Sequence, residues 1–370
     1  MKNLRLIIFM LFFLANCFVM MASPKLASGD LTDFEKEVNA AIERRLKWLE
    51  NQELTPSDNY YYGKIALRAL AFLEHGYLES EDEEKFKLPD NVGEDISSLE
   101  KFLGEGYQQN IDALQKCYLD EYDRNVKKYF SEKKLNPNKK FPTCHHRLIY
   151  EIACAIMALK KTNNPDYDDE IIRGLQFLVD AQNETNGGFG WRYYMTYTES
   201  QVDVINTHFA ILALFLGKEI AKKDEKLAEK VDLALTRAIE FVSSLQSKES
   251  QNQVKYGGFA YSSRQKGYSQ SRAEKVNESF LSGSLTAAGI WCLNLHDVKK
   301  EDQRISGAVK FLKDNYINDY VSQNGHRYVP NPVILPSSKK SVSPWLYYYY
   351  WSLAKALDLT FNPPNLAFPE

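Results

Sequence analysis

The sequence predicts an all-α protein whose helices form an α/α toroid, in which an inner ring of helices is enclosed by an outer ring. Amphipathic segments recur along the chain, and each is followed by a long apolar run rich in Ala and Leu. A helix with one apolar face lies at a surface, whereas an apolar helix is surrounded by other helices. Repeated alternation of the two kinds therefore predicts two concentric layers of helices, without strands.

The amphipathic segments share an aromatic residue that is followed, four or five positions later, by Gln or Tyr. The recurring pairs are Phe177 with Gln182, Phe241 with Gln246, Phe311 with Tyr316 and, one residue shorter, Trp48 with Gln52. Trp48 precedes Phe177 by close to two repeat lengths, so a degenerate copy of the repeat is expected between them, within residues 97–117. The repeat indicates one array of similar units rather than several unrelated domains.

The apolar runs fall after each amphipathic segment and are the expected inner helices. They cover residues 65–73, 148–159, 207–216, 285–295 and 346–357. Strands are not expected there, because these runs are too long and too rich in good helix formers. The sequence thus predicts about five helix pairs in a single domain over residues 23–370.

Composition limits the classes of function. The chain has 370 residues, of which 44% are hydrophobic and 13% aromatic, so it can bury a large core. Its formal net charge of −3 gives no general attraction to nucleic acid or to anionic membranes. We therefore expect no nucleic-acid partner.

The N-terminus has the order of features of a secretory signal peptide. Lys2 and Arg5 precede an apolar run over residues 6–21, and the small residues Ala22 and Ser23 follow. Residues 1–22 are therefore expected to be removed on export to the periplasm or the medium, leaving no transmembrane span in the mature chain. The alternative is a lipoprotein anchored at Cys17, whose preceding residues resemble a lipobox.

Four cysteines remain after such a cleavage. Cys117, Cys144, Cys154 and Cys292 would meet an oxidising compartment, which permits disulfides, but the sequence does not determine their pairing. Cys154 and Cys292 lie inside apolar helical runs and are expected to be small buried hydrophobes.

Two loops of the chain carry a glycine pair followed by an aromatic residue, at residues 187–191 and 257–259. Together with Arg-Gly-x-x-Phe-Leu-x-x-x-Gln over residues 173–182, this pattern resembles the QW repeat of squalene and hopene cyclases. More broadly, residues 34–357 resemble the prenyltransferase and squalene oxidase repeat. The resemblance implies an α/α toroid in which the repeat glutamine bridges helix ends and the aromatic residue stacks nearby. The matching positions are Gln182 with Trp191, and Gln246 with Phe259.

The family's acid motif is incomplete. The cyclases protonate their substrate with D-x-D-D-T-A at the start of an inner helix, and residues 203–208 occupy what resembles the same place. Ile205 and Asn206 replace the second and third aspartates, and neither can supply the strong acid needed to protonate an alkene. Asp203 and His208 remain the candidate catalytic residues. The alternative is that Asp203 caps a helix.

Metal and cofactor binding are not expected. The resemblance to protein prenyltransferase β subunits would imply a zinc ion held by Asp, Cys and His, but the sequence has no Asp-x-Cys pair. Cys292 with His296, and Cys144 with His145 and His146, are too few or too closely spaced to form a convincing ligand set.

Parallel inner helices would bring their N-termini and the glycine loops to one rim. An aromatic-lined mouth with a few polar groups is typical of a small-molecule site. The candidate ligand-binding residues are Trp191, Tyr193, Tyr194, Tyr256, Phe259, Tyr261 and Trp345.

Three functions follow as hypotheses. The first is binding of a small apolar or isoprenoid-like ligand without cyclase activity. The second is a divergent enzyme, either terpene-cyclase-like or a polysaccharide lyase or hydrolase. The third is a scaffold that binds a protein partner through its outer surface.

Overall fold

The computed structural model describes residues 33–56, 60–77, 87–104, 148–185, 188–192, 202–247, 256–261, 281–314 and 346–361. Within these ranges the protein forms ten α-helices, one short 3-10 helix and a single two-stranded sheet. The predicted all-α class is therefore confirmed for the part of the chain that the structure describes.

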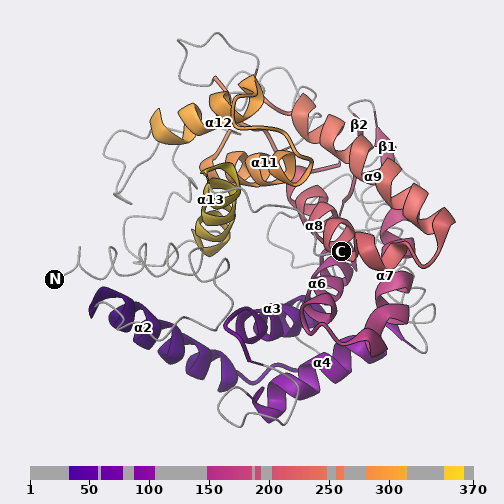
Figure 1. The fold of residues 1–370 in the computed structure, drawn as a ribbon, viewed down its shortest axis with the longest axis vertical. Helices are drawn as coiled ribbons and strands as arrows, with labels where there is room; N and C mark the ends of the chain where they lie inside the picture. The colour runs from indigo at the N-terminus through magenta and orange to yellow at the C-terminus, as the bar shows by residue number, and fades with distance from the viewer. Residues whose placement is uncertain are drawn as a thin grey trace, which may run out of the picture.

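The helices alternate between two series along the chain. The amphipathic series consists of α2 (Asp33–Glu50), α4 (Asp90–Leu103), α7 (Asp168–Asp180), α9 (Glu225–Ser244) and α12 (Gln303–Asp314). The apolar series consists of α3 (Tyr61–Glu74), α6 (Leu148–Lys161), α8 (Val204–Ala221), α11 (Gly283–Leu295) and α13 (Leu346–Phe361). In Figure 1 the apolar series lies toward the middle of the view and the amphipathic series lies outside it.

Burial distinguishes the two series as the sequence predicts. In α6 every residue from Glu151 to Leu159 is buried, so neighbours surround this helix on all sides. In α9 the buried residues recur at helical spacing, as Val231, Leu235, Ala238 and Val242 do, and the intervening face is polar. The helix α8 is apolar enough to cross a membrane by length and composition, but most of it is buried against α6, α7, α9 and α11.

The degenerate copy of the repeat that was predicted within residues 97–117 begins earlier than expected. Its helix, α4, starts directly after Pro89 and ends at Leu103, so only its last two turns overlap the prediction. Phe102 occupies the recurring aromatic position and is almost completely buried. The boundary was misplaced because Pro89 stops the preceding chain and Asp90 favours a helix start, a signal that the repeat spacing does not contain.

A short hairpin was not predicted. Strand β1 (Asn183–Thr185) pairs antiparallel with β2 (Gly188–Gly190), with Asn183 opposite Gly190. The next copy has an isolated bridge between Gln246 and Phe259. The glycine loops therefore turn back on themselves in both copies, which brings each loop aromatic close to the end of its amphipathic helix.

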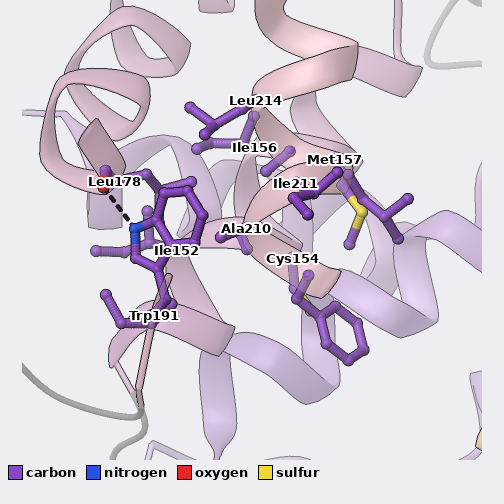
Figure 2. Close-up of a cluster of buried hydrophobic side chains, with 14 of the residues drawn as sticks. Ile152, Cys154, Ile156, Met157, Leu178, Trp191, Ala210, Ile211 and Leu214 are labelled. Carbon is purple, nitrogen blue, oxygen red and sulfur yellow. Dashed lines mark hydrogen bonds between the residues drawn. The ribbon is translucent and has the colours of Figure 1, made fainter. Parts of the chain in front are cut away.

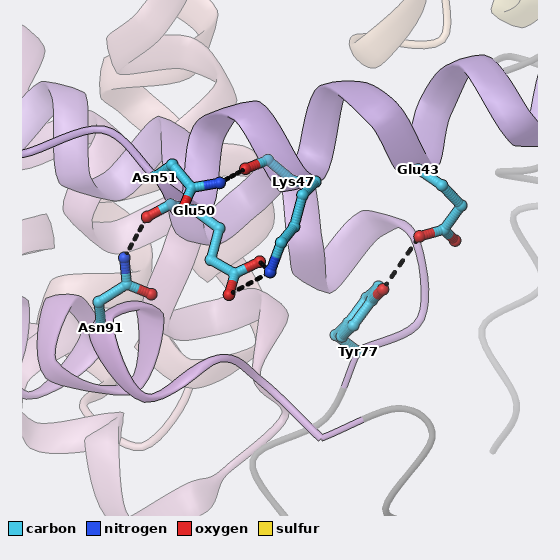
Figure 3. Close-up of polar contacts among 6 residues, drawn as sticks. All are labelled: Glu43, Lys47, Glu50, Asn51, Tyr77 and Asn91. Atoms are coloured by element: carbon cyan, nitrogen blue, oxygen red, sulfur yellow. Dashed lines mark hydrogen bonds and ion pairs between the residues drawn. The ribbon is translucent and has the colours of Figure 1, made fainter.

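Helix α2, the first of the amphipathic series, accepts hydrogen bonds from α4 and from the residues that follow α3 (Figure 3). The Asn91 amide donates to the Glu50 carbonyl at 2.6 Å, and the Tyr77 hydroxyl donates to the Glu43 carboxylate at 3.3 Å. Next to these contacts, the buried Arg68 guanidinium of α3 donates to the Asp95 carboxylate of α4 at 2.5 and 2.7 Å. These bonds connect α2, α3 and α4.

Candidate functional site

Both glycine loops are attached to the first turn of an apolar helix in the same way. The Trp191 backbone N–H donates to the Thr207 hydroxyl of α8 at 3.1 Å, and the Phe259 N–H donates to the Thr286 hydroxyl of α11 at 3.1 Å. Both threonines are fully buried, so each hydroxyl satisfies a loop N–H that water cannot reach. The predicted equivalence of Trp191 and Phe259 therefore extends to their hydrogen bonds.

The repeat glutamines connect successive amphipathic helices. The Gln182 amide donates to the Ala234 carbonyl of α9 at 2.8 Å, and the Gln246 amide donates to the Arg304 carbonyl of α12 at 2.7 Å. Each accepting carbonyl lies seven residues before the recurring phenylalanine of the next copy. The first glutamine differs, because the Gln52 amide donates to the Trp48 carbonyl within its own turn. In this copy the glutamine follows the aromatic residue by four positions instead of five.

Trp191 is fully buried among aliphatic side chains of α6, α7 and α8 (Figure 2). Its indole N–H donates to the Leu178 carbonyl at 2.6 Å, which satisfies the only polar atom of the ring. Phe259 is also fully buried and lies against Gly289 of α11, where an added Cβ would be 2.7 Å from the ring. These two aromatic side chains contribute to packing between helices.

The loop glycines cover the phenylalanine of the next copy. A Cβ on Gly188, which has a φ of +125°, would lie 3.0 Å from the Phe241 Cβ, and one on Gly190 would lie 3.2 Å from the Phe241 ring. In the following copy, a Cβ on Gly258 would lie 2.6 Å from the Phe311 ring. Glycine is needed at Gly188 because of its positive φ, and at Gly258 because the loop backbone lies directly on the Phe311 ring. At Gly190 the closest obstacles to a Cβ are the Val202 Cγ1 and the Thr207 hydroxyl oxygen, at 2.5 and 2.6 Å.

Asp203 begins α8 as its N-cap. Its carboxylate accepts the backbone N–H groups of Ile205 and Asn206 at 3.0 and 2.9 Å, and the Asn206 amide at 2.7 Å. The side chain of Tyr261 also hydrogen-bonds this carboxylate. Burial raises the pKa of Asp203 to about 6, although these hydrogen bonds act in the opposite direction. The capping geometry expected as the alternative role is therefore present.

His208 lies one turn further along α8, among aromatic rings. Its ring centroid is 4.8 Å from that of Trp291 on α11 and 6.1 Å from that of Trp351 on α13. Burial lowers the pKa of His208 to about 3, so the imidazole is neutral at physiological pH. A neutral imidazole in this place is a weakly polar ring packed against other aromatic rings.

The rings around His208 come from helices that are far apart in the sequence and were not predicted to meet. The Trp291 and Trp351 centroids are 4.7 Å apart with the planes at 76°, and Phe209 lies 5.8 Å from Trp351 and 4.7 Å from Tyr150. We call Tyr150, His208, Phe209, Trp291 and Trp351 the inner aromatic cluster; its members come from α6, α8, α11 and α13. Tyr150 and Trp351 are half-buried, whereas the other three are buried. The sequence signal that could have indicated this cluster is the presence of aromatic residues within the predicted inner helices.

The remaining predicted residues fall in different places. Tyr256 is half-buried and lies against Gly307 of α12, and the Tyr261 carbonyl accepts the Val204 N–H at 2.9 Å. Asp203, Trp191 and Tyr261 thus meet at the start of α8, since the Asp203 N–H also donates to the Trp191 carbonyl at 3.2 Å. Tyr193, Tyr194 and Trp345 lie outside the described residues.

The described cysteines lie in the interior of the protein. Cys154 and Cys292 are buried free thiols, as predicted, and burial raises the pKa of both. Cys17, Cys117 and Cys144 lie outside the described residues. Within the described ranges, no three or more His, Cys, Asp or Glu side chains are grouped so that they could hold a metal ion.

Comparison of this chain with models of protein families, with curated proteins and with solved structures finds no match. The resemblance to the prenyltransferase and squalene oxidase repeat therefore rests on the residues that carry it. The hydrogen bonds of the two glycine loops and the inner aromatic cluster are the observations from which a function can be argued.

Proposed function

We propose that the chain is an exported α/α toroid that binds a small apolar or lipid-like molecule against the inner aromatic cluster, without cyclising it. The ring arrangement is supported by contacts between successive apolar helices, from α3 through α6, α8 and α11 to α13. It is also supported by the repeated glutamine bonds between amphipathic helices. Export is supported by residues 1–22, which lie outside the described residues.

The observation that carries the binding proposal is the composition of the inner aromatic cluster. Four helices supply rings that meet edge to face, and Tyr150 and Trp351 keep part of their surface exposed to solvent. Burying such surface against an apolar molecule contributes about 25 cal/mol per Å². His208 is held neutral by burial, so it adds no charge that would oppose an apolar ligand.

The absence of cyclase activity is proposed from the start of α8. Ile205 and Asn206 stand at the positions of two acidic residues in the cyclase motif, and the Asn206 amide is bound to the Asp203 carboxylate. A carboxylate that accepts two backbone N–H groups and an amide is held as a helix cap.

The test is a thermal-shift and tryptophan-fluorescence titration of the mature chain with farnesol, oleic acid and cellohexaose. We expect farnesol or oleic acid to raise the melting temperature and cellohexaose to leave it unchanged. Trp351→Ala should weaken binding about tenfold, or ~1.4 kcal/mol, whereas Trp48→Ala on the outer helix α2 should not. Silence of both apolar probes, or equal losses in the two variants, would remove the support for this site.

Catalysis is the second candidate, and the raised pKa of Asp203 favours it. A carboxyl group with a pKa of about 6 lies in the range used by general acids near neutral pH. If Asp203 and His208 are catalytic, Asp203→Asn and the volume-keeping His208→Phe should abolish conversion of an isoprenoid or an oligosaccharide, followed by mass spectrometry, in variants that remain folded by circular dichroism. A loss of stability without any turnover to lose would assign Asp203 to helix capping alone.

A further inference from the structure

Tyr60 has a strained backbone at the start of α3. Its φ of 60° and ψ of 36° lie in the left-handed region, which a bulky side chain rarely adopts. Tyr60 is the N-cap of α3, but its side chain makes no capping hydrogen bond to the helix. Ser, Thr, Asp or Asn would provide such a bond. Helix capping therefore does not explain a tyrosine in this position, and strain of this kind often marks a functional site.

The ring of Tyr60 lies against the inner aromatic cluster. Its centroid is 6.5 Å from that of Tyr150, and the two planes are at 84°. The members of the cluster come from α6, α8, α11 and α13, whereas Tyr60 belongs to the start of α3. With Tyr60 included, each of the five helices of the apolar series contributes a ring to one connected set.

The start of α3 is held in place by two neighbouring rings. A Cβ on Gly63 would overlap the Tyr150 ring of α6, so a glycine is needed for this ring to lie directly on the first turn of α3. Tyr62 stacks on Phe102 of α4, with centroids 3.9 Å apart and planes at 11°. The Tyr60 ring is thus positioned by packing against α4 and α6, before any ligand binds. A site that is already formed loses less freedom on binding.

The rings that remain accessible form a row. Successive centroids from Tyr60 through Tyr150 and Phe209 to Trp351 are 6.5, 4.7 and 5.8 Å apart. All four lie near the start of their helices, since Tyr150 is the third residue of α6 and Phe209 and Trp351 are the sixth residues of α8 and α13. Tyr60, Tyr150 and Trp351 are half-buried, so both ends and the middle of the row can present part of a ring to a ligand.

We infer that Tyr60 extends the ligand site onto α3, and that the ligand is a single unbranched hydrocarbon chain that contacts Tyr60 and Trp351 at once. A long-chain alcohol or fatty acid has this form. A row of rings fits a long, thin molecule because the apolar area buried grows with chain length, whereas a compact molecule covers only part of the row. The inference rests on the proposed function, since it specifies which molecule the same site takes.

The test uses straight-chain alcohols from octanol to hexadecanol, titrated into the mature chain and followed by tryptophan fluorescence. We expect the affinity to rise about fourfold with each added methylene until the chain reaches Tyr60. Adamantanol has as many carbon atoms as decanol, but they form a compact cage. It should therefore bind at least tenfold more weakly than decanol.

Tyr60→Asn removes the ring and relieves the backbone, because asparagine adopts the left-handed conformation more readily and is a preferred N-cap. Its melting temperature should equal or exceed that of the wild type. Hexadecanol should bind at least tenfold more weakly, and octanol less than twofold, since octanol needs only Phe209 and Trp351. The matched control is Tyr61→Asn, which removes a ring that lies 5.2 Å from Tyr62, and it should leave the affinity for both alcohols unchanged.

The outcomes separate this inference from the proposed function. If Tyr60→Asn weakens neither alcohol while Trp351→Ala weakens both, the site remains but Tyr60 is not part of it. Equal losses for both alcohols, accompanied by a lower melting temperature, would assign Tyr60 to folding alone. Tighter binding of adamantanol than of decanol would overturn the unbranched chain. If no alcohol binds, and farnesol and oleic acid do not bind either, the proposed function fails together with this inference.

Discussion

Replacing Gly190 by alanine tests whether the glycine loops are fixed by close packing. The new Cβ would lie 2.5 Å from the Val202 Cγ1 and 2.6 Å from the Thr207 hydroxyl oxygen, far inside normal contact. Overpacking a rigid interior costs about 1–3 kcal/mol. The displaced hydroxyl also accepts the Trp191 N–H, and a weakened buried hydrogen bond adds roughly 1 kcal/mol. We therefore expect Gly190→Ala to lower the free energy of unfolding by about 2–4 kcal/mol.

The matched control is Gly93→Ala in α4, where a new Cβ meets nothing within 4 Å. Alanine is favoured over glycine inside a helix by about 0.5–1 kcal/mol, so this variant should be slightly more stable than wild type. The two midpoints are compared by circular dichroism at 222 nm during guanidinium and thermal unfolding. For a chain of this length, a loss of 2–4 kcal/mol should lower the melting temperature by roughly 3–6 °C.

The reasoning is refuted if Gly190→Ala is neutral or shifts in the same direction as Gly93→Ala. Gly258→Ala offers an independent repetition, because its Cβ would be 2.6 Å from the Phe311 ring in the next copy. Similar losses at Gly190 and Gly258 would show that the two loops are energetically as well as geometrically equivalent.

Three further predictions concern the start of α8. Thr207→Val, which keeps the volume but leaves a buried loop N–H unpaired, should cost about 1–3 kcal/mol in chemical denaturation, whereas the exposed Thr236→Val should change little. The pKa of Asp203 is raised to about 6, which means that the folded state favours the protonated carboxyl group. The stability gained from this protonated form is full below pH 4 and is lost as the pH rises through 6. The free energy of unfolding of the wild type minus that of Asp203→Asn should therefore fall by about 3 kcal/mol between pH 4 and pH 7. The pKa of His208 is lowered to about 3, so its contribution is present above pH 6.5 and is lost as the pH falls toward 3. In that window His208→Phe should reduce the loss of unfolding free energy by roughly 1.4 kcal/mol for each pH unit of acidification. If the pH dependence of stability below pH 6.5 is the same in His208→Phe as in the wild type, the imidazole is not buried in its neutral form.

The helices were predictable because their signal is local. The apolar run at residues 148–159 and the amphipathic spacing of Val231, Leu235 and Ala238 specify which faces avoid water, and the structure forms α6 and α9 accordingly. The start of α4 and the hairpin of residues 183–190 were missed. Both depend on single residues, a proline and a glycine pair, that the periodic pattern does not contain.

The candidate site was predictable only in part. The loop with Trp191 and the start of α8 at Asp203 do meet, as the repeat indicates. The sequence placed Trp191 and Phe259 among ligand-binding residues, whereas the structure buries both completely between helices. The inner aromatic cluster was not recognised, because Trp291 and Trp351 lie 60 positions apart and nothing in either helix alone indicates that their rings meet.

The sequence by itself determined the helical class, the alternation of amphipathic and apolar helices, and the recurrence of a glutamine and glycine loop. These properties follow from spacing within a few turns of chain. Only the tertiary structure decided that Asp203 is enclosed by donors, that His208 lies among tryptophans, and that Trp48 is the one exposed member of the five recurring aromatic positions described here. Such facts depend on which distant segments become neighbours, and burial, pKa and exposure are set by those neighbours rather than by the residue itself.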